Sequence, residues 1–339
     1  WAIRKFQPDV IINRFDHRTS GNTHGHHSAS AILSVESFTK TNDPNVFPEQ
    51  LSLVEPWQVK RQFFNTSWWF YGSQEKFNAA DKTNLISFQT GVYYASIGKS
   101  NQEIAALSRS RHQSQGFGST GSRGEETEYL EQINGDILKG KKSIFEGIDT
   151  SWNRVKGGRA VGELLNKVID NFDFKNPSAS IFDLVKVYSM IQTLEENHWK
   201  AIKSEELKNC IAACAGLYLE AVASSQEITT GSNLKLKLEA INRSSVGMQL
   251  VSLTTLPDSK TFPQNKVLTT NGSNKIQLDL QIPSETEYTQ PYWLKETGTT
   301  GMYIVKDQKN IGIPDVIRET KVVFNIRIDE IEIPFERTI

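Results

Sequence analysis

Four of the six histidines in this chain lie within eleven residues, at His17, His24, His26 and His27. Imidazole is the commonest protein ligand for zinc-like metals and the commonest general acid or base near neutral pH. A metal hydrolase needs such side chains at fixed spacing, together with an open position for water. The run therefore indicates a metal-binding or acid–base site. The alternative is a histidine-rich surface loop that is solvated and idle.

Two predicted elements flank the histidine run and would hold it in place. Residues 8–12, with the sequence Pro-Asp-Val-Ile-Ile, are typical of a short buried strand. After the run, apolar residues recur at helical spacing, at Ala31, Ile32, Val35 and Phe38. The histidines are thus expected in a strand-to-helix loop, and in α/β proteins such loops line the crevice at the carboxyl ends of the strands.

The spacing within the loop separates the histidines by role. His24 and His27 are three residues apart across a glycine-containing turn, so both rings are expected to face one point. His26 would then tend to point elsewhere. Asp16 and His17 lie upstream, where they could orient a ligand.

The pattern of strand, polar loop, His24-Gly25-His26-His27 and small-residue helix resembles the second half of the metal site in PIG-L-like zinc deacetylases (N-acetylglucosaminyl-phosphatidylinositol de-N-acetylase-like). The resemblance implies a zinc-dependent hydrolase that removes acetyl groups from an N-acetylated amino sugar or a related amide. It implies that His27 is a metal ligand and that His24 stabilises the oxyanion and protonates the leaving amine. With it, Asp16 joins His24 as a catalytic candidate, and the substrate-binding candidates are Arg14, His26, His112 and Gln115.

Further segments share this resemblance, and one motif is missing. Residues 109–118 resemble a late His-x-Ser-Gln stretch of large bacterial members, which similarly carry aromatic runs, then helices and a β-sandwich. The family's early His-Pro-Asp-Asp-type motif, which supplies two ligands and the general base, is absent. The chain is therefore expected to be an incomplete part of the enzyme, without a complete tetrahedral zinc site and inactive alone. Strand 10–12 is expected beside another chain, a retained upstream segment or a bare sheet edge.

Three regions are predicted along the chain. Residues 1–150 mix strands and helices and are expected to be an α/β, partial Rossmann-like deacetylase domain, in which Ser100 and Glu103 form a capping box. Residues 151–225 are expected to be a helical segment with a connector near Lys203. Residues 226–339 alternate apolar and polar residues, which predicts an all-β, Ig-like sandwich. Its expected inward-facing residues are Leu234, Leu236, Leu238, Leu278, Leu280, Phe324 and Ile326.

Two further patterns have structural interpretations. The aromatic run at residues 63–71 is expected to be mainly a core strand and its edge, with a sugar-stacking platform as the alternative. Cys210 and Cys214 lie on a helical apolar stripe and are expected to be small core residues, too far apart at that spacing for a disulfide.

Composition limits the possible partners. The net charge of −1 gives no general attraction to nucleic acid or anionic membranes, and no apolar run is long enough to span a bilayer. The expected partner is an N-acetylated sugar or glycoconjugate, in the bacterial envelope, either periplasmic or secreted. The alternatives are a non-catalytic glycan-binding protein, in which the histidine loop is vestigial, and a structural envelope protein.

Overall fold

The computed structural model describes residues 1–19, 23–140 and 143–339, so residues 20–22 of the histidine loop lie outside the description. Two compact units form, Trp1–Ile148 and Asp149–Ile339. The histidine run belongs to the first unit, and the alternating sequence near the C-terminus belongs to the second. Among the described helices, none is long and apolar enough to cross a membrane.

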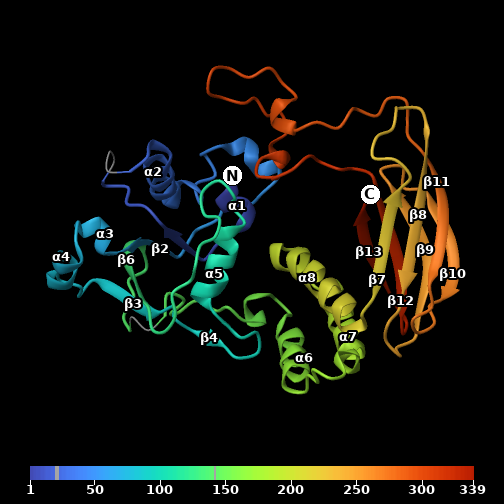
Figure 1. Ribbon diagram of the computed structural model, residues 1–339, viewed down its shortest axis with the longest axis horizontal. Coiled ribbons are helices and arrows are strands. Elements are labelled where there is room, and N and C mark those ends of the chain that lie inside the picture. Colours follow the sequence, from blue (N-terminus) through green and yellow to red (C-terminus); the bar gives the residue numbers. More distant parts are fainter. Residues whose placement is uncertain (20–22, 141–142) are drawn as a thin grey trace. The chain divides into compact units, whose positions relative to one another are not determined.

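The first unit is built on a mixed sheet (Figure 1). Its strands β1 (Val10–Asn13), β2 (Arg61–Thr66), β6 (Thr127–Gly135) and β3 (Leu85–Gln89) lie in the order β1-β2-β6-β3. β1 and β2 are parallel, with helix α2 (Gly25–Lys40) in the connection between them, as an α/β unit requires. β6 runs antiparallel to both β2 and β3, so that only the first pair of strands has the parallel pairing of a Rossmann-like sheet.

The remaining elements of the first unit are short. The helices are α1 (Ala2–Phe6), α3 (Trp68–Tyr71), α4 (Gln74–Ala79) and α5 (Asn101–Ser110), and the small strands are β4 (Tyr93–Tyr94) and β5 (Lys99–Ser100). Helix α5 begins with the expected capping box, in which the Ser100 hydroxyl accepts from the Glu103 backbone and the Glu103 carboxylate accepts from the Ser100 backbone.

Strand β1 is an edge strand in the part of the chain that the structure describes, since β2 is its one partner there. The expectation of a buried strand was therefore wrong in part: Ile12 is 48% exposed, whereas Phe63 and Phe64 on the neighbouring β2 are almost fully buried. Among the described residues, no second strand pairs with the other edge of β1. Such an edge presents unpaired backbone N–H and C=O groups.

The second unit contains two antiparallel sheets that share one hydrophobic core (Figure 1). One sheet has the order β10-β9-β12-β13 and the other β11-β8-β7. Six of the seven residues expected to face inward are buried, while Leu278 is half-buried and packs against the same core. The strands are β7 (Tyr218–Ala223), β8 (Asn233–Ile241), β9 (Met248–Leu256), β10 (Thr261–Val267), β11 (Asn274–Gln281), β12 (Lys321–Ile328) and β13 (Ile331–Thr338).

Three helices pack into that same core: α6 (Arg159–Asp170), α7 (Ile181–Gln192) and α8 (His198–Ala215). The predicted connector near Lys203 was wrong, because Lys203 lies inside α8. Asn197 caps the start of the helix: its side chain accepts a hydrogen bond from the backbone N–H of Lys200 at 3.0 Å. After α8 the chain turns at Gly216, in the left-handed conformation that favours glycine, and enters β7.

The expectation that both cysteines are core residues was wrong for Cys210, which is exposed, whereas Cys214 is partly buried and packs against the core. Leu207, Ile211 and Ala215 form the buried face of α8. The buried stripe therefore follows a spacing of four residues, and the cysteines lie beside it.

Candidate metal and sugar site

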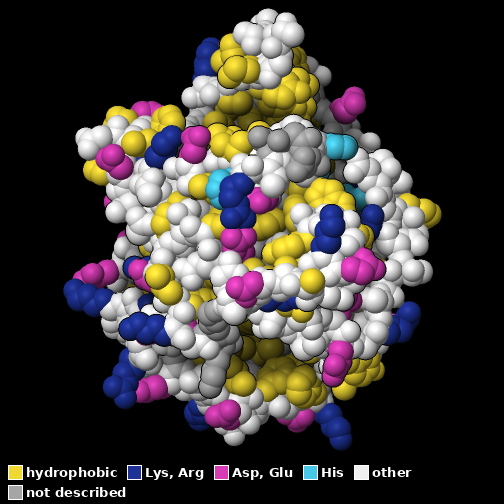
Figure 2. All heavy atoms as spheres, turned by 90° about the vertical axis from the view of Figure 1, so that its left-hand side faces the viewer, with side chains coloured by type: hydrophobic (Ala, Val, Ile, Leu, Met, Phe, Trp, Pro, Cys, Tyr) yellow, Lys and Arg dark blue, Asp and Glu magenta, His cyan; other side chains and the backbone are white. Residues whose placement is uncertain are grey.

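His24 occupies the position just before helix α2 begins. Its backbone is extended, and its carbonyl accepts the first helical hydrogen bonds, from the N–H groups of His27 at 2.9 Å and Ser28 at 3.2 Å. The imidazole makes no capping hydrogen bond to the helix. His26 and His27 follow in the first turn, so one short stretch of backbone carries all three rings. Histidine side chains are visible at the surface in Figure 2.

The three rings converge. Their nitrogen atoms, one per residue, lie within 4.8 Å of one another. The ring centroids of His24 and His27 are 5.6 Å apart, which agrees with the expected convergence of these two residues, and those of His26 and His27 are 4.0 Å apart. The expectation that His26 points elsewhere was wrong, because the tight helical turn brings it to the same group.

His27 is the most firmly held of the three. Its ring stacks on Phe15, with centroids 3.9 Å apart and planes inclined by 13°. Desolvation, followed by the charges of His26 and His24, lowers the pKa of His27 below its ordinary value. The neutral imidazole, which is the form that ligates a metal, is therefore favoured at neutral pH.

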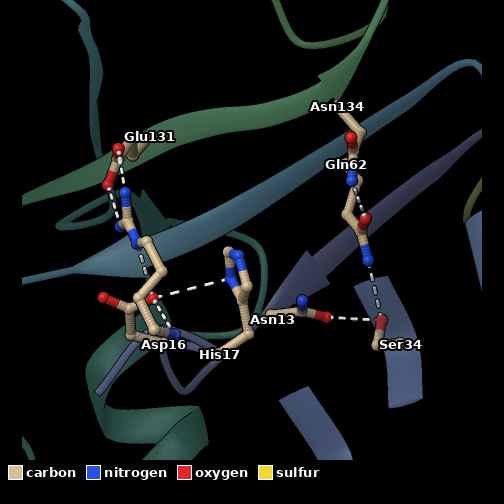
Figure 3. Close-up of polar contacts among 8 residues, drawn as sticks. Asn13, Asp16, His17, Ser34, Gln62, Glu131 and Asn134 are labelled. Carbon is tan, nitrogen blue, oxygen red and sulfur yellow. Dashed lines mark hydrogen bonds and ion pairs between the residues drawn. The ribbon is translucent and has the colours of Figure 1, made fainter. Parts of the chain in front are cut away.

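Asp16 is held by Arg18 rather than by a histidine (Figure 3). The Arg18 backbone N–H and side-chain Nε donate to Asp16 Oδ1 at 3.0 and 2.9 Å, while His17 Nδ1 lies 3.6 Å from that oxygen, too far for a hydrogen bond. Burial acts to raise the pKa of Asp16, but the hydrogen bonds and charge of Arg18, with His17, outweigh it and lower that pKa. Asp16 is thus ionised and a weak base, suited to positioning the loop.

Arg18 also joins the histidine loop to the sheet. Its two terminal nitrogens donate to the two carboxylate oxygens of Glu131 on β6, at 2.9 and 2.7 Å. The hydrogen bonds that Arg18 donates to the two carboxylates, first Glu131 and then Asp16, raise the pKa of its guanidinium. The histidine loop follows β1, and this pair of hydrogen bonds ties it to β6, on the far side of β2.

A chain of polar side chains crosses the sheet beneath the loop (Figure 3). Asn134 donates to Gln62 at 2.8 Å, Gln62 donates to the Ser34 hydroxyl at 2.8 Å, and Ser34 donates to Asn13 Oδ1 at 2.7 Å. The chain ends at the Asn13 side-chain amide nitrogen, which, like His17 Nδ1, is buried without a hydrogen-bond partner among the described residues. Such groups are uncommon in folded proteins.

Arg14 leads from the loop to a cavity at the carboxyl end of β2. Its guanidinium donates to Asn65 Oδ1, and Asn65 in turn donates to Glu128 at 2.8 Å. The cavity holds about 400 Å³. Arg14 lines it together with Trp68 and residues of α4 and the start of β6.

The other two expected substrate-binding residues lie elsewhere in the unit. His112 and Gln115 are exposed in the turn that follows α5, where the His112 carbonyl accepts hydrogen bonds from the backbone of Gln115 and Gly116. Among the interactions of the described residues, none joins these two side chains to the histidine group or to the cavity at β2.

Sequence reasoning missed Arg18, Glu131 and Asn13. Asn13 precedes Arg14 and Arg18 follows His17, so their positions beside candidate residues could have pointed to them. Glu131 is 113 residues from Arg18, and no local pattern marks that pairing.

Comparisons with known proteins give little to add. No family model matches the chain, and no curated protein matches it. Among solved structures, the alkylpurine DNA glycosylase AlkC of Pseudomonas fluorescens, bound to DNA containing an abasic site analog, matches 51% of this chain and 50% of its own, with 10% identity and a TM-score of 0.20. The match thus spans half the length of that protein, and at this TM-score it carries no argument about fold or function.

Proposed function

We propose that the first unit carries the metal site of a hydrolase that removes the acetyl group from an N-acetylated amino sugar or a related amide. The observation that supports this most is the convergence of His24, His26 and His27 at the carboxyl end of a parallel strand pair. Ligand sites in α/β sheets occur at this edge. In this proposal the unit is a partial Rossmann-like, PIG-L-like deacetylase domain and the C-terminal sheets form an Ig-like sandwich, in a bacterial envelope protein.

The donor set fits a zinc-like ion. Neutral imidazole is a preferred zinc ligand, and two ligand nitrogens on a tetrahedral ion lie about 3.3 Å apart. The nitrogens of the group already lie within 4.8 Å of one another, and two of the three side chains are exposed, so side-chain rotation can close the remaining gap. His27 and His26, whose rings are nearest, are the proposed ligands.

The remaining residues have separate proposed tasks. A bound zinc ion supplies Lewis-acid polarisation of the amide carbonyl and lowers the pKa of a water ligand to about 7. His24, which lies beside both ligands, faces the scissile amide, where it stabilises the oxyanion and gives a proton to the leaving amine. Asp16 holds Arg18 and hence the loop, and Arg14 faces the sugar.

This division of roles leaves the zinc ion short of protein ligands. Catalytic zinc sites use three protein ligands and one open position, and His26 and His27 supply two. The third ligand, and the base that takes the proton of water, must come from another segment or chain. The bare edge of β1 is the proposed docking place, because a strand added there would end beside the histidine group.

The test uses protein purified from its natural source, so that any docked segment is retained. Release of acetate from N-acetylglucosamine conjugates is measured before and after chelation. We expect activity that is lost on chelation, restored by zinc and absent from a His27→Ala protein, while recombinant residues 1–339 alone release no acetate. A natural preparation that releases no acetate, or full activity from residues 1–339 alone, would contradict the proposal.

A second candidate is a non-catalytic glycan-binding protein, which the cavity beside Trp68 favours. It predicts sugar binding without acetate release from the natural preparation. The same assay, combined with a binding measurement, separates the two functions.

A further inference from the structure

Three aromatic residues, Trp68, Phe77 and Tyr129, line part of the cavity at the carboxyl end of β2. Trp68, the first residue of α3, lines it and is 50% exposed. Trp69 is equally exposed on the same helix but does not line the cavity. A large half-exposed aromatic ring at the wall of a cavity is a preferred contact for the flat apolar face of a ligand, since such rings bury much area at little cost in conformational entropy.

The lining of the cavity also carries neutral hydrogen-bonding groups. Gln74 and Asn78 lie one turn apart on α4, and the Gln74 amide donates to the Asn78 carbonyl at 2.8 Å. Both side chains are exposed, and each keeps further donor or acceptor positions. Tyr129 and Thr127 on β6 add hydroxyl groups. Such a lining suits a ligand that carries several hydroxyl groups around an apolar ring face.

The charges at the cavity argue against a phosphate-bearing ligand. Glu126 and Glu128 line it and oppose the single guanidinium of Arg14. Asn65 accepts from Arg14 and donates to Glu128, so this amide brings a carboxylate near the guanidinium, and the negative charge offsets part of the positive charge there. An uncharged ring meets no repulsion there, whereas a phosphate would face two carboxylates.

We infer that this cavity is a sugar subsite, in which an uncharged pyranose ring stacks on Trp68 and its hydroxyl groups bond to Gln74, Asn78 and the carboxylates of Glu126 and Glu128. The inference rests on the proposed function for the choice of an N-acetylated sugar. The subsite would hold a sugar ring next to the histidine group. Arg14 connects the two places, because it lines the cavity and also belongs to the histidine loop.

Calorimetric titration with N,N′-diacetylchitobiose in the presence of a chelator tests the subsite without catalysis. We expect Trp68→Ala to weaken binding about tenfold and Gln74→Ala to weaken it measurably, whereas the matched Trp69→Ala protein binds within about twofold of the unchanged chain. Because Gln74 is exposed on a short helix, its variant tests the cavity even if Trp68→Ala does not fold.

Equal losses for Trp68→Ala and Trp69→Ala, no binding of the disaccharide, or stronger binding of adenosine monophosphate would overturn the inference. None of these results depends on metal or on acetate release. Failure of the subsite is therefore distinguishable from failure of the proposed hydrolase.

Discussion

Removing Arg18 should loosen the histidine loop more than removing its partner Glu131. Asp16 is 9% exposed and accepts two hydrogen bonds from Arg18, so Arg18→Ala leaves a buried carboxylate without its side-chain donor, at a cost of about 1–3 kcal/mol. The other donor is a backbone N–H, which the variant keeps, so the lower half of that range is expected. The Arg18–Glu131 pair is more exposed, at 47% and 21%, and contributes at most about 1 kcal/mol.

The assay is hydrogen–deuterium exchange of peptides that span residues 10–40, because the chain has two compact units and global unfolding need not be a single transition. Arg18→Ala should speed exchange there more than Glu131→Ala. Adding Asp16→Asn to Arg18→Ala should recover part of the loss, since the uncompensated charge is removed. Equal effects of the two single variants, or no recovery in the double variant, would refute the assigned roles.

The same network gives a pH dependence with a definite sign. The pKa of Asp16 in the folded chain lies below its ordinary value of 3.8, so its contribution to stability is present above that value. The contribution is lost as the pH falls further, through the lowered pKa of the folded state. Exchange of the loop peptides should accelerate over that acidic range in the unchanged chain and less in Asp16→Asn.

Three further predictions concern single sites. His27 should titrate below 6.5 in an NMR experiment, and His26→Ala should raise its midpoint more than His24→Ala, because His26 is the larger of the two charge effects; an unchanged midpoint in both variants would be contrary evidence. Arg4 is 2% exposed and donates to backbone carbonyls just after α2, including those of Thr41 at 3.0 Å and Asp43 at 2.8 Å. Arg4→Met should therefore destabilise the first unit by about 3 kcal/mol, as measured by thermal unfolding. Arg4→Lys, which keeps a donor, should destabilise it by less. Leu236→Ala should destabilise the second unit by about 2–5 kcal/mol, whereas exposed Lys237→Ala should change little; similar losses would mean that the register of β8 is misassigned.

Sequence patterns predicted the strands and helices whose defining residues lie within a few positions of one another. The alternation over residues 233–240 and 275–282 predicts strands at β8 and β11, and the structure pairs Leu236 with Leu278 and Lys237 with Gln277 across them. The capping box at Ser100 and the helical stripe after the histidine loop were likewise readable, because their interactions lie within four residues.

Features set by distant contacts were not predictable in this way. The exposure of Ile12 depends on β1 having a neighbour on one side, which its own sequence does not encode. The aromatic run divides where β2 ends: Phe63 and Phe64 are buried between neighbouring strands, while Trp68 and Trp69 are half-exposed on α3. At the site, the convergence of His24 and His27 followed from their spacing, but the Arg18–Glu131 tie required the fold.

Zinc titration of residues 1–339 tests the central claim most directly. The histidine group should give one weak zinc site that is lost in His27→Ala and weakened in His26→Ala. His112→Ala, which removes an exposed histidine outside the group, should bind zinc as the unchanged chain does. Zinc binding that survives His27→Ala, or that is lost in His112→Ala, would contradict the assignment of the metal to the start of α2.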